Sequence, residues 1–355
     1  MGRIRPSTLC LAVALAALLA VLFLTRDALL VAHSDESIFY FSSDAATYFA
    51  AYEAFYQNIE IAERPELFLV GSPILFMKLA DGNLFLIQLS QLALMAVSLW
   101  VGVRCFSSFN ARLAFIVGAL VFPYFLFGFM SLNKEVFAMC SAIFFTSYLV
   151  RGNKSHVLLA LVLAICARYY MVIALLALLF LVPRDGPPRL KWTVALLVLI
   201  SIAAPIAKST VPAYSSEDLL EAPGVAGILF SKSIDSYAYF LVYPFKYLTL
   251  IPLRAYSFMI DSTRLGNAME GFISLLTLAL VLPSLWLLFT GKAMAPLVRR
   301  LIIAALVAPV PIMWSEIMHW RYYSFVYFFL LTALVLHYVD RPRSARPPPV
   351  GAVHA

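Results

Sequence analysis

The chain has 355 residues, of which 63% are hydrophobic and 13% charged, and its formal net charge is +7. One soluble core could not bury this much apolar surface, and long apolar runs recur along the chain, which excludes the soluble globular class. The basic residues stand in small clusters between the apolar runs, a pattern typical of membrane topology and not of nucleic-acid binding. We therefore predict an all-α, polytopic integral membrane protein of the cell inner membrane, with membrane lipid but no nucleic acid among its partners.

The N-terminal segment has Arg3 and Arg5 before an apolar run of about 17 residues. Such a segment is either a cleaved signal peptide or an uncleaved first helix. No clear A-x-A cleavage motif follows the run, so we favour the uncleaved helix.

The basic clusters determine how the chain crosses the membrane, because Lys and Arg near the ends of apolar segments resist translocation. If every cluster is cytoplasmic, both termini are cytoplasmic as well. The clusters are Arg3/Arg5, Arg104/Arg112, Arg151/Lys154, Arg184/Arg189/Lys191, Lys292/Arg299/Arg300 and Arg341/Arg343/Arg346. Between them the apolar runs predict about eight full spans, near residues 8–25, 83–103, 113–130, 136–150, 193–210, 269–290, 301–318 and 325–339.

The apolar run 157–183 does not fit a single crossing. As one helix it would be about 40 Å long, too long for a hydrocarbon core of about 30 Å. One crossing would also carry the cluster at 184–191 to the outside. We predict a re-entrant or split helix pair that turns near Ala167-Arg168-Tyr169, with Arg168 facing a polar cavity and not lipid.

This threading concentrates the acidic residues on the outer face. Only Asp185 and Asp340 are cytoplasmic, and the other acids lie outside or in the outer half of the membrane. The segments are placed by Lys and Arg alone, and Asp and Glu contribute little to membrane topology. The excess of acids on the outer face is therefore independent of how the segments are placed. The outer face is therefore where we expect chemistry.

Two outer segments are too long to be simple turns. The first, 33–82, has tyrosines mainly at four-residue spacing between Tyr40 and Tyr56, which predicts a helix lying at the membrane interface. The second, 211–268, mixes Tyr, Pro, Lys and Arg with apolar residues and is typical of a loop that follows the membrane surface.

The remaining sequence contains no zinc spacing, Gly-rich phosphate loop, internal repeat or soluble domain. The four cysteines lie in or beside apolar runs without C-x-x-C spacing, so neither a metal nor a disulfide is indicated. We predict a single transmembrane domain over 1–340 and a disordered cytoplasmic tail over 341–355.

Asp44, in "FYFSSDAATYF", follows Ser42-Ser43 and precedes a helical stretch. It can be a helix N-cap, or it can be a general base that takes a proton from a hydroxyl at the outer membrane surface. The pair Asp35 and Glu36 is the alternative base, although a plain solvated loop is the favoured explanation of that pair.

Three further motifs carry charge at or near the predicted outer face. In "SLNKE", Lys134 either extends to the interface or holds a phosphate, and Glu135 either caps a helix or orients a substrate hydroxyl. In "HWRYY", Arg321 either anchors an interfacial belt or binds a phosphate by its guanidinium fork. Arg168 lies within an apolar run, where a cation is costly unless it has a partner or a function.

In the order of these features the chain resembles the GT-C superfamily of membrane glycosyltransferases, which use polyprenyl-phosphate-linked sugars. The likeness covers about residues 1–340 and rests on "SSDAATY", "SLNKE", "CARYY" and the late Arg-Tyr pair in "HWRYY". Unlike the better-known branches, this chain has no separate extracytoplasmic domain and no Asp-Asp or Asp-x-Asp pair. No metal site is therefore assigned, and a divalent cation held by Glu135 is kept as the weaker alternative.

The resemblance implies transfer of a sugar from a polyprenyl-phosphate-linked donor to an acceptor glycan in exopolysaccharide or envelope-glycan biosynthesis. Asp44 would be the catalytic base, and Lys134, Arg168 and Arg321 would stabilise the phosphate leaving group. Glu135, Tyr48 and Tyr322 would orient the substrates.

Two alternatives remain. A polysaccharide polymerase or ligase acting on lipid-pyrophosphate-linked repeat units would share this leaving group. A lipid-linked oligosaccharide transporter, or a non-catalytic subunit, ranks third, because the charges crowd the outer end and do not follow a path through the midplane.

Overall fold

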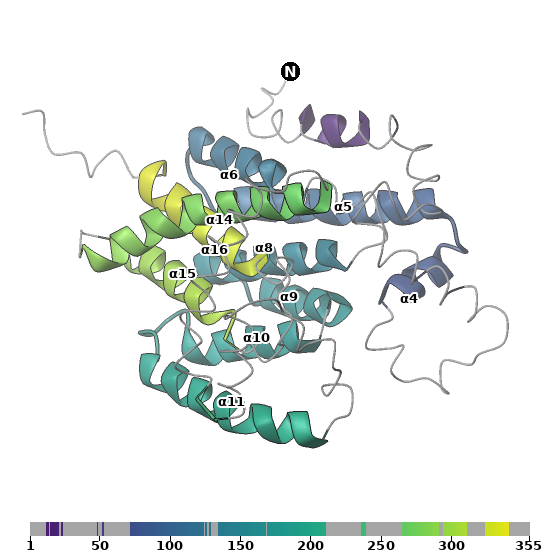
Figure 1. Cartoon of the computed structure of the whole chain (residues 1–355). Helices are drawn as coiled ribbons and strands as arrows, with labels where there is room; N and C mark the ends of the chain where they lie inside the picture. Colours follow the sequence, from purple (N-terminus) through teal and green to yellow (C-terminus); the bar gives the residue numbers. More distant parts are fainter. Residues whose placement is uncertain are drawn as a thin grey trace, which may run out of the picture.

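The chain folds into a bundle of α-helices in the computed structural model (Figure 1). The structure describes residues 12–13, 15–20, 23, 48, 52, 72–123, 125, 128, 134–167, 169–210, 236–238, 265–290, 294–310 and 324–340. No β-strand occurs within these residues, so the all-α prediction is confirmed for them.

The helix boundaries follow the apolar runs of the sequence closely. The helices are α4 (Ser72–Leu79), α5 (Leu84–Val103), α6 (Phe109–Val121), α8 (Glu135–Arg151), α9 (Lys154–Ala167), α10 (Tyr169–Leu181), α11 (Leu190–Thr210), α14 (Leu265–Phe289), α15 (Pro296–Val307) and α16 (Ser324–Tyr338). Helix α4 falls inside the segment 33–82 that the sequence predicted as an outer loop.

Two helices differ from the predicted spans at their ends. Helix α6 stops at Val121, whereas the apolar run predicted a span near 113–130. Phe122, the C-cap, has φ −73° and ψ 113°, an extended conformation favoured by the proline that follows it. Helix α15 ends at Val307, before the predicted limit of 318.

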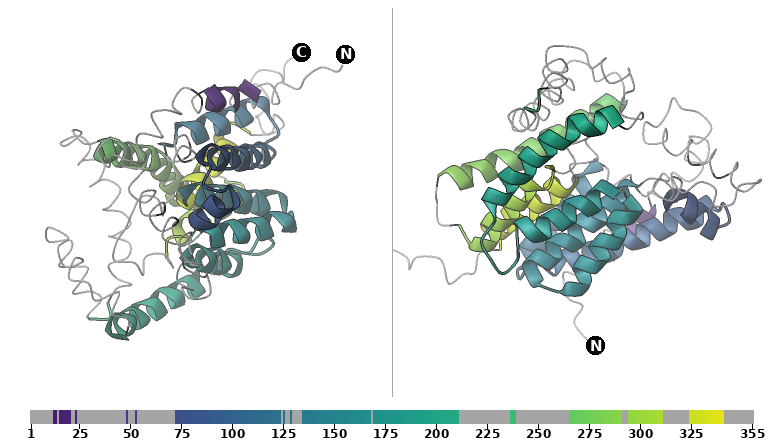
Figure 2. Two further views of the ribbon diagram at one scale, coloured as in Figure 1. Left: turned by 90° about the vertical axis from the view of Figure 1, so that its right-hand side faces the viewer. Right: turned by 90° about the horizontal axis from the view of Figure 1, so that it is seen from below.

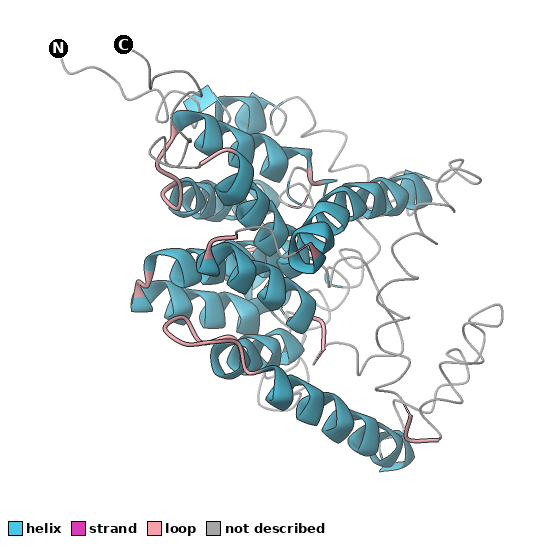
Figure 3. Ribbon diagram, turned by 90° about the vertical axis from the view of Figure 1, so that its left-hand side faces the viewer, coloured by secondary structure: helices cyan, strands magenta, loops and turns pink. Residues whose placement is uncertain are grey.

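Helix α8 forms the centre of the bundle. Nearly all its side chains are buried, and it packs against α5, α9 and α16. Ser141 Oγ donates to the Ala160 carbonyl at 2.7 Å and so joins α8 to α9. Helix α16 in turn packs against α6, α14 and α15, and the Tyr327 hydroxyl donates to the Gly118 carbonyl at 2.6 Å. Helices α11 and α14 lie at the edges, beside α10 and α16 respectively (Figures 2 and 3).

The basic turns meet at one end of the bundle, which we call the basic end. The Asp340 carboxylate, just after α16, accepts hydrogen bonds from the backbone N–H groups of Ser107 and Ser108 at 2.9 and 2.8 Å, in the α5–α6 turn. His156, in the first turn of α9, has its Nδ1 3.0 Å from Ser147 Oγ near the end of α8. These contacts bring the ends of α5, α8 and α16 to the same level as the starts of α6 and α9.

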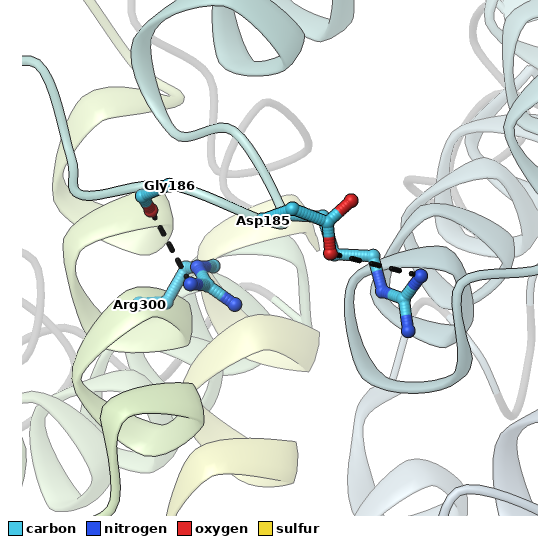
Figure 4. A network of polar contacts seen from close by, with 4 residues as sticks. Asp185, Gly186 and Arg300 are labelled. Carbon is cyan, nitrogen blue, oxygen red and sulfur yellow. Dashed lines mark hydrogen bonds and ion pairs between the residues drawn. The ribbon is translucent and has the colours of Figure 1, made fainter.

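The loop between α10 and α11 reaches the same end. The Arg184 guanidinium lies against Gly152, the C-cap residue of α8. Arg300 Nη2, on α15, donates to the Gly186 carbonyl at 3.3 Å (Figure 4). The chain therefore leaves the basic end with α9 and returns to it with α10.

Helices α9 and α10 are consequently an antiparallel pair. The first ends at Ala167 and the second begins at Tyr169, which is where the sequence predicted the turn. Together they span the run 157–183 that could not be one straight crossing.

The outward-facing surface of the bundle is strongly apolar. On α9, Leu158, Val162 and Ile165 are exposed at helical spacing, while Ala160 and Ala164 face the core. A helix that is apolar all round suits a lipid environment. Two helical stretches, Phe85–Val103 and Gly271–Phe289, are long and apolar enough to span a membrane.

Candidate functional site

The candidate site lies where α8 begins, at the opposite end of the bundle from the basic turns. The 17 residues of α8 extend about 25 Å from this end to Arg151 at the basic end. We call this the Lys134 end.

Lys134 and Glu135 are both buried here, with 7% and 3% of their surfaces exposed. Burial of charged groups is costly unless they are paired or hydrogen-bonded, and both residues have interaction partners. Such burial argues against a Lys134 side chain that simply extends to water. Lys134 is the N-cap residue of α8 and makes no side-chain capping bond. Glu135, the next residue, stands in the first turn of the helix, where the helix dipole favours a negative charge.

Tyr48 joins this pair from the N-terminal part of the chain. The Lys134 Nζ lies 5.2 Å from the centroid of the Tyr48 ring, within the range of a cation–π contact. The ring itself is buried against Met77, Ala80 and Ile87. The contact between Tyr48 and Lys134 was not predicted, although both residues were predicted to orient or bind substrate.

The turn between α4 and α5 supports the tyrosine. Asp81 and Gly82 have φ values of 50° and 71°, which make the turn tight enough to bring α4 back against α5. Asn83 then caps α5, because its Oδ1 accepts from the Leu86 N–H at 3.2 Å. Tyr52, four residues after Tyr48, is also packed against this corner, consistent with the four-residue tyrosine spacing of the sequence.

Helix α5 contributes buried polar side chains that the sequence analysis missed. Helices α5 and α8 run parallel, with Ser98 beside Cys140 and Gly102 facing Ile143. This register brings Gln91, two turns before Ser98, level with the first turn of α8. Gln88 and Gln91 are both buried, and their three-residue spacing puts them on one face of α5. Two glutamines inside an apolar span were the signal that could have identified them.

Three other helix ends lie at the Lys134 end. Helix α9 ends there at Ala167, α10 begins there at Tyr169, and α16 begins there at Ser324, since the opposite ends of all three are at the basic end. Six of the predicted site residues lie outside the described residues: Asp35, Glu36, Asp44, Arg168, Arg321 and Tyr322. Arg168 stands in the sequence directly between α9 and α10, and Arg321 stands three residues before α16.

Within the described part of the chain, no group of three or more His, Cys, Asp or Glu side chains could hold a metal ion. This end of the bundle holds a buried ammonium group in contact with an aromatic ring, and it also contains the buried residues Glu135, Gln88 and Gln91. A buried ammonium group can bind a phosphate strongly because little water screens it.

Comparisons with protein-family models, with curated proteins and with solved structures found no match.

Proposed function

We propose that the protein is a multi-pass membrane glycosyltransferase of the GT-C type, with both termini in the cytoplasm. It transfers a sugar from a polyprenyl-phosphate-linked donor to an acceptor glycan on the extracytoplasmic face, in exopolysaccharide or envelope-glycan assembly. The observation that carries the proposal is the buried Lys134, which lies under Tyr48 at the end of the bundle away from the basic turns.

The orientation follows from the charges. Lys and Arg clusters are retained in the cytoplasm, so the basic end is the cytoplasmic end. The Lys134 end then faces the extracytoplasmic side. The outward-facing apolar side chains of α9, together with the two spanning-length stretches in α5 and α14, support a location in the membrane.

In the proposed reaction an acceptor hydroxyl oxygen attacks the anomeric carbon as the bond to the donor phosphate breaks. The hydroxyl proton passes to the Asp44 carboxylate, and the polyprenyl phosphate leaves with the bonding electrons. Lys134, with Arg168 and Arg321, stabilises the charge that grows on the leaving phosphate. Glu135, Tyr48 and Tyr322 orient the two substrates. A single displacement inverts the anomeric configuration.

The distribution of buried charge favours a transferase over a transporter. Among the described residues, Lys134 and Glu135 are the only buried members of the Asp, Glu, Lys and Arg group, and they are adjacent. A transporter would require ionisable groups along a path through the midplane. Buried charge confined to one end of the bundle suits a reaction at one membrane surface.

The first test measures binding of undecaprenyl phosphate, the leaving group, to the purified full chain by native mass spectrometry. Lys134→Met should weaken binding by roughly 10-fold or more, because a charge-assisted hydrogen bond is lost from a buried site. Lys78→Met is the matched control, since Lys78 is exposed near the same end and should bind as wild type. Undiminished binding by Lys134→Met would refute the assignment of this residue to the phosphate.

The second variant separates binding from chemistry. The Asp44→Asn variant should still bind undecaprenyl phosphate. When it is given a panel of polyprenyl-phosphate-linked hexoses and pentoses as donors, it should release polyprenyl phosphate about 10²-fold more slowly than the wild type. Asn remains a good N-cap, so a purely structural Asp44 would leave turnover intact. If turnover instead collapses in Asp35→Asn or Glu36→Gln, the base belongs to that earlier pair.

A further inference from the structure

The corner between α10 and α11 combines aromatic side chains with arginine at the basic end. The Arg189 guanidinium lies 4.6 Å from the centroid of the Phe180 ring. The Phe180 and Trp192 rings are 5.8 Å apart and nearly perpendicular, at 75°. These three residues, which we call the α10–α11 corner, form one continuous cluster.

The corner is open on its outer side. Phe180 and Trp192 are 47% and 58% exposed, and Leu190 between the clustered residues is exposed as well. Large aromatic rings in this position are costly in water but favourable at the level of lipid headgroups, where amphipathic rings gather. At the same end, Arg104, the C-cap residue of α5, lies 4.4 Å from the centroid of the exposed Trp100 ring, which marks the same level.

The loop before the corner is held in place from both sides. The Arg189 N–H donates to the Leu181 carbonyl at 2.7 Å and closes the loop at its base. Arg300 holds the middle of the loop through the Gly186 carbonyl, as Figure 4 shows. Little conformational entropy would therefore be lost when a ligand binds to the loop cations.

The charge of the corner is not neutralised within the described residues. Arg189 makes no ion pair there, and the loop acid, Asp185, pairs only loosely with Arg184, at 3.9 Å and with its own side chain 86% exposed. Arg184, Arg189 and Lys191 thus outnumber the single acid of this loop. An anionic partner would neutralise the cations of the corner. The exposed apolar surface beside these cations suits a partner that also has acyl chains.

We propose that the α10–α11 corner binds the headgroup of an anionic phospholipid in the cytoplasmic leaflet. Arg189, with Arg184 and Lys191, contacts the phosphate and any further headgroup anion, while Phe180 and Trp192 lie against the upper acyl chains. The proposal rests on the membrane location proposed above, but not on the transferase reaction.

The test uses the fluorescence of Trp192 in the full chain after the other four tryptophans are replaced by Phe. The protein is reconstituted in phosphatidylcholine vesicles that contain brominated phosphatidylglycerol or brominated phosphatidylcholine, whose bromine atoms quench a contacting tryptophan. Brominated phosphatidylglycerol should quench at several-fold lower mole fraction. Arg189→Gln should reduce this preference about fivefold, the usual contribution of one cation near an anionic surface.

Arg104→Gln is the matched control, because it removes the same charge at the same end but just after α5, which lies across the bundle from α11 (Figure 1). It should leave the lipid preference at Trp192 unchanged. Native mass spectrometry of the wild-type chain, titrated with the two unbrominated lipids, provides a second measurement that needs no tryptophan substitution.

Three outcomes would overturn the proposal. Equal quenching by the two lipids would show that the corner has no headgroup preference, and displacement of phosphatidylglycerol by inorganic phosphate would assign the site to a free anion. Absence of quenching by either lipid would remove the corner from the bilayer. None of these results bears on undecaprenyl phosphate binding at Lys134, so the two proposals fail separately.

Discussion

Asp340 connects the end of α16 to the start of α6 through a single carboxylate. Besides the two backbone N–H groups, the Ser107 hydroxyl donates to it at 2.9 Å. Ser108 in turn caps α6, with its Oγ accepting from the Ala111 N–H at 3.2 Å. Partial burial acts to raise the pKa of Asp340, but the hydrogen bonds from Ser107 and Ser108 together outweigh it, so the pKa lies below its ordinary value.

A lowered carboxyl pKa means that this contact stabilises the fold at neutral pH. The contribution is fully present above the ordinary carboxyl pKa and is lost as the pH falls through the lowered one. Asp340→Asn should therefore lower the free energy of unfolding by about 1 kcal/mol near neutral pH, after allowance for solvent screening.

Thermal unfolding of the two proteins in detergent, from about pH 7 down to about pH 3, measures this effect. The difference between wild type and Asp340→Asn should shrink at the acidic end. A difference that is constant across the range would mean that the ionised form of Asp340 is not what stabilises the contact.

At the residue scale, sequence reasoning found the chemical types of the site but not their contacts. Lys134 and Glu135 stood out because charge at the end of an apolar span is unusual. The position of Tyr48 over Lys134 depends on the α4–α5 turn, which lies about 33 residues after Tyr48 and about 52 residues before Lys134. No local periodicity encodes such a contact.

The turn between α8 and α9 is the element that fixes how the two central helices pack. Gly152 closes α8 in the left-handed region, with φ 77°, and its N–H donates to the Tyr148 carbonyl at 2.7 Å. Arg184 fills the space where a β-carbon would lie. Glycine is therefore required at this position for two separate reasons.

Gly152→Ala should destabilise the protein by about 1–2 kcal/mol, because alanine is strained in the left-handed region and its methyl group would displace Arg184. Gly186→Ala is the control: its added carbon would meet only Pro183 Cγ at an ordinary 3.5 Å. Melting temperatures of the two variants in detergent should differ clearly. Equal melting temperatures would contradict this explanation of the turn.

At the element scale, most helix boundaries could be predicted because apolar length and basic turns encode them directly. The break between α9 and α10 followed from length and charge alone. The early end of α6 did not, since the apolar run continues beyond Val121 and only the local effect of the following proline stops the helix.

The whole molecule has two chemically different ends, and this difference predicts its orientation in the membrane. Asp185 lies in the loop at the basic end, and Lys78 lies on α4 near the Lys134 end; both are exposed. In a cysteine-free background, a membrane-impermeant maleimide applied to intact cells should label Lys78→Cys but not Asp185→Cys.

Inverted membrane vesicles should give the reverse pattern. Labelling of Asp185→Cys from outside the cell would contradict the proposed return of the chain with α10, and with it the orientation of everything downstream. Labelling of both positions from the same side would mean that the two ends of the bundle do not face opposite compartments.

The shortness of α9 and α10 has a consequence for the bilayer around them. Their 14 and 13 residues extend only about 21 and 20 Å, against a hydrocarbon core of about 30 Å. Lipids beside the apolar outer face of α9 would have to thin to match it, at a modest cost per ångström of mismatch. Such a local dip in the outer leaflet would draw the headgroup of a long-chain lipid down toward the turn between the two helices. The donor of the proposed reaction could then enter sideways from the membrane, while the proposed acceptor arrives from water.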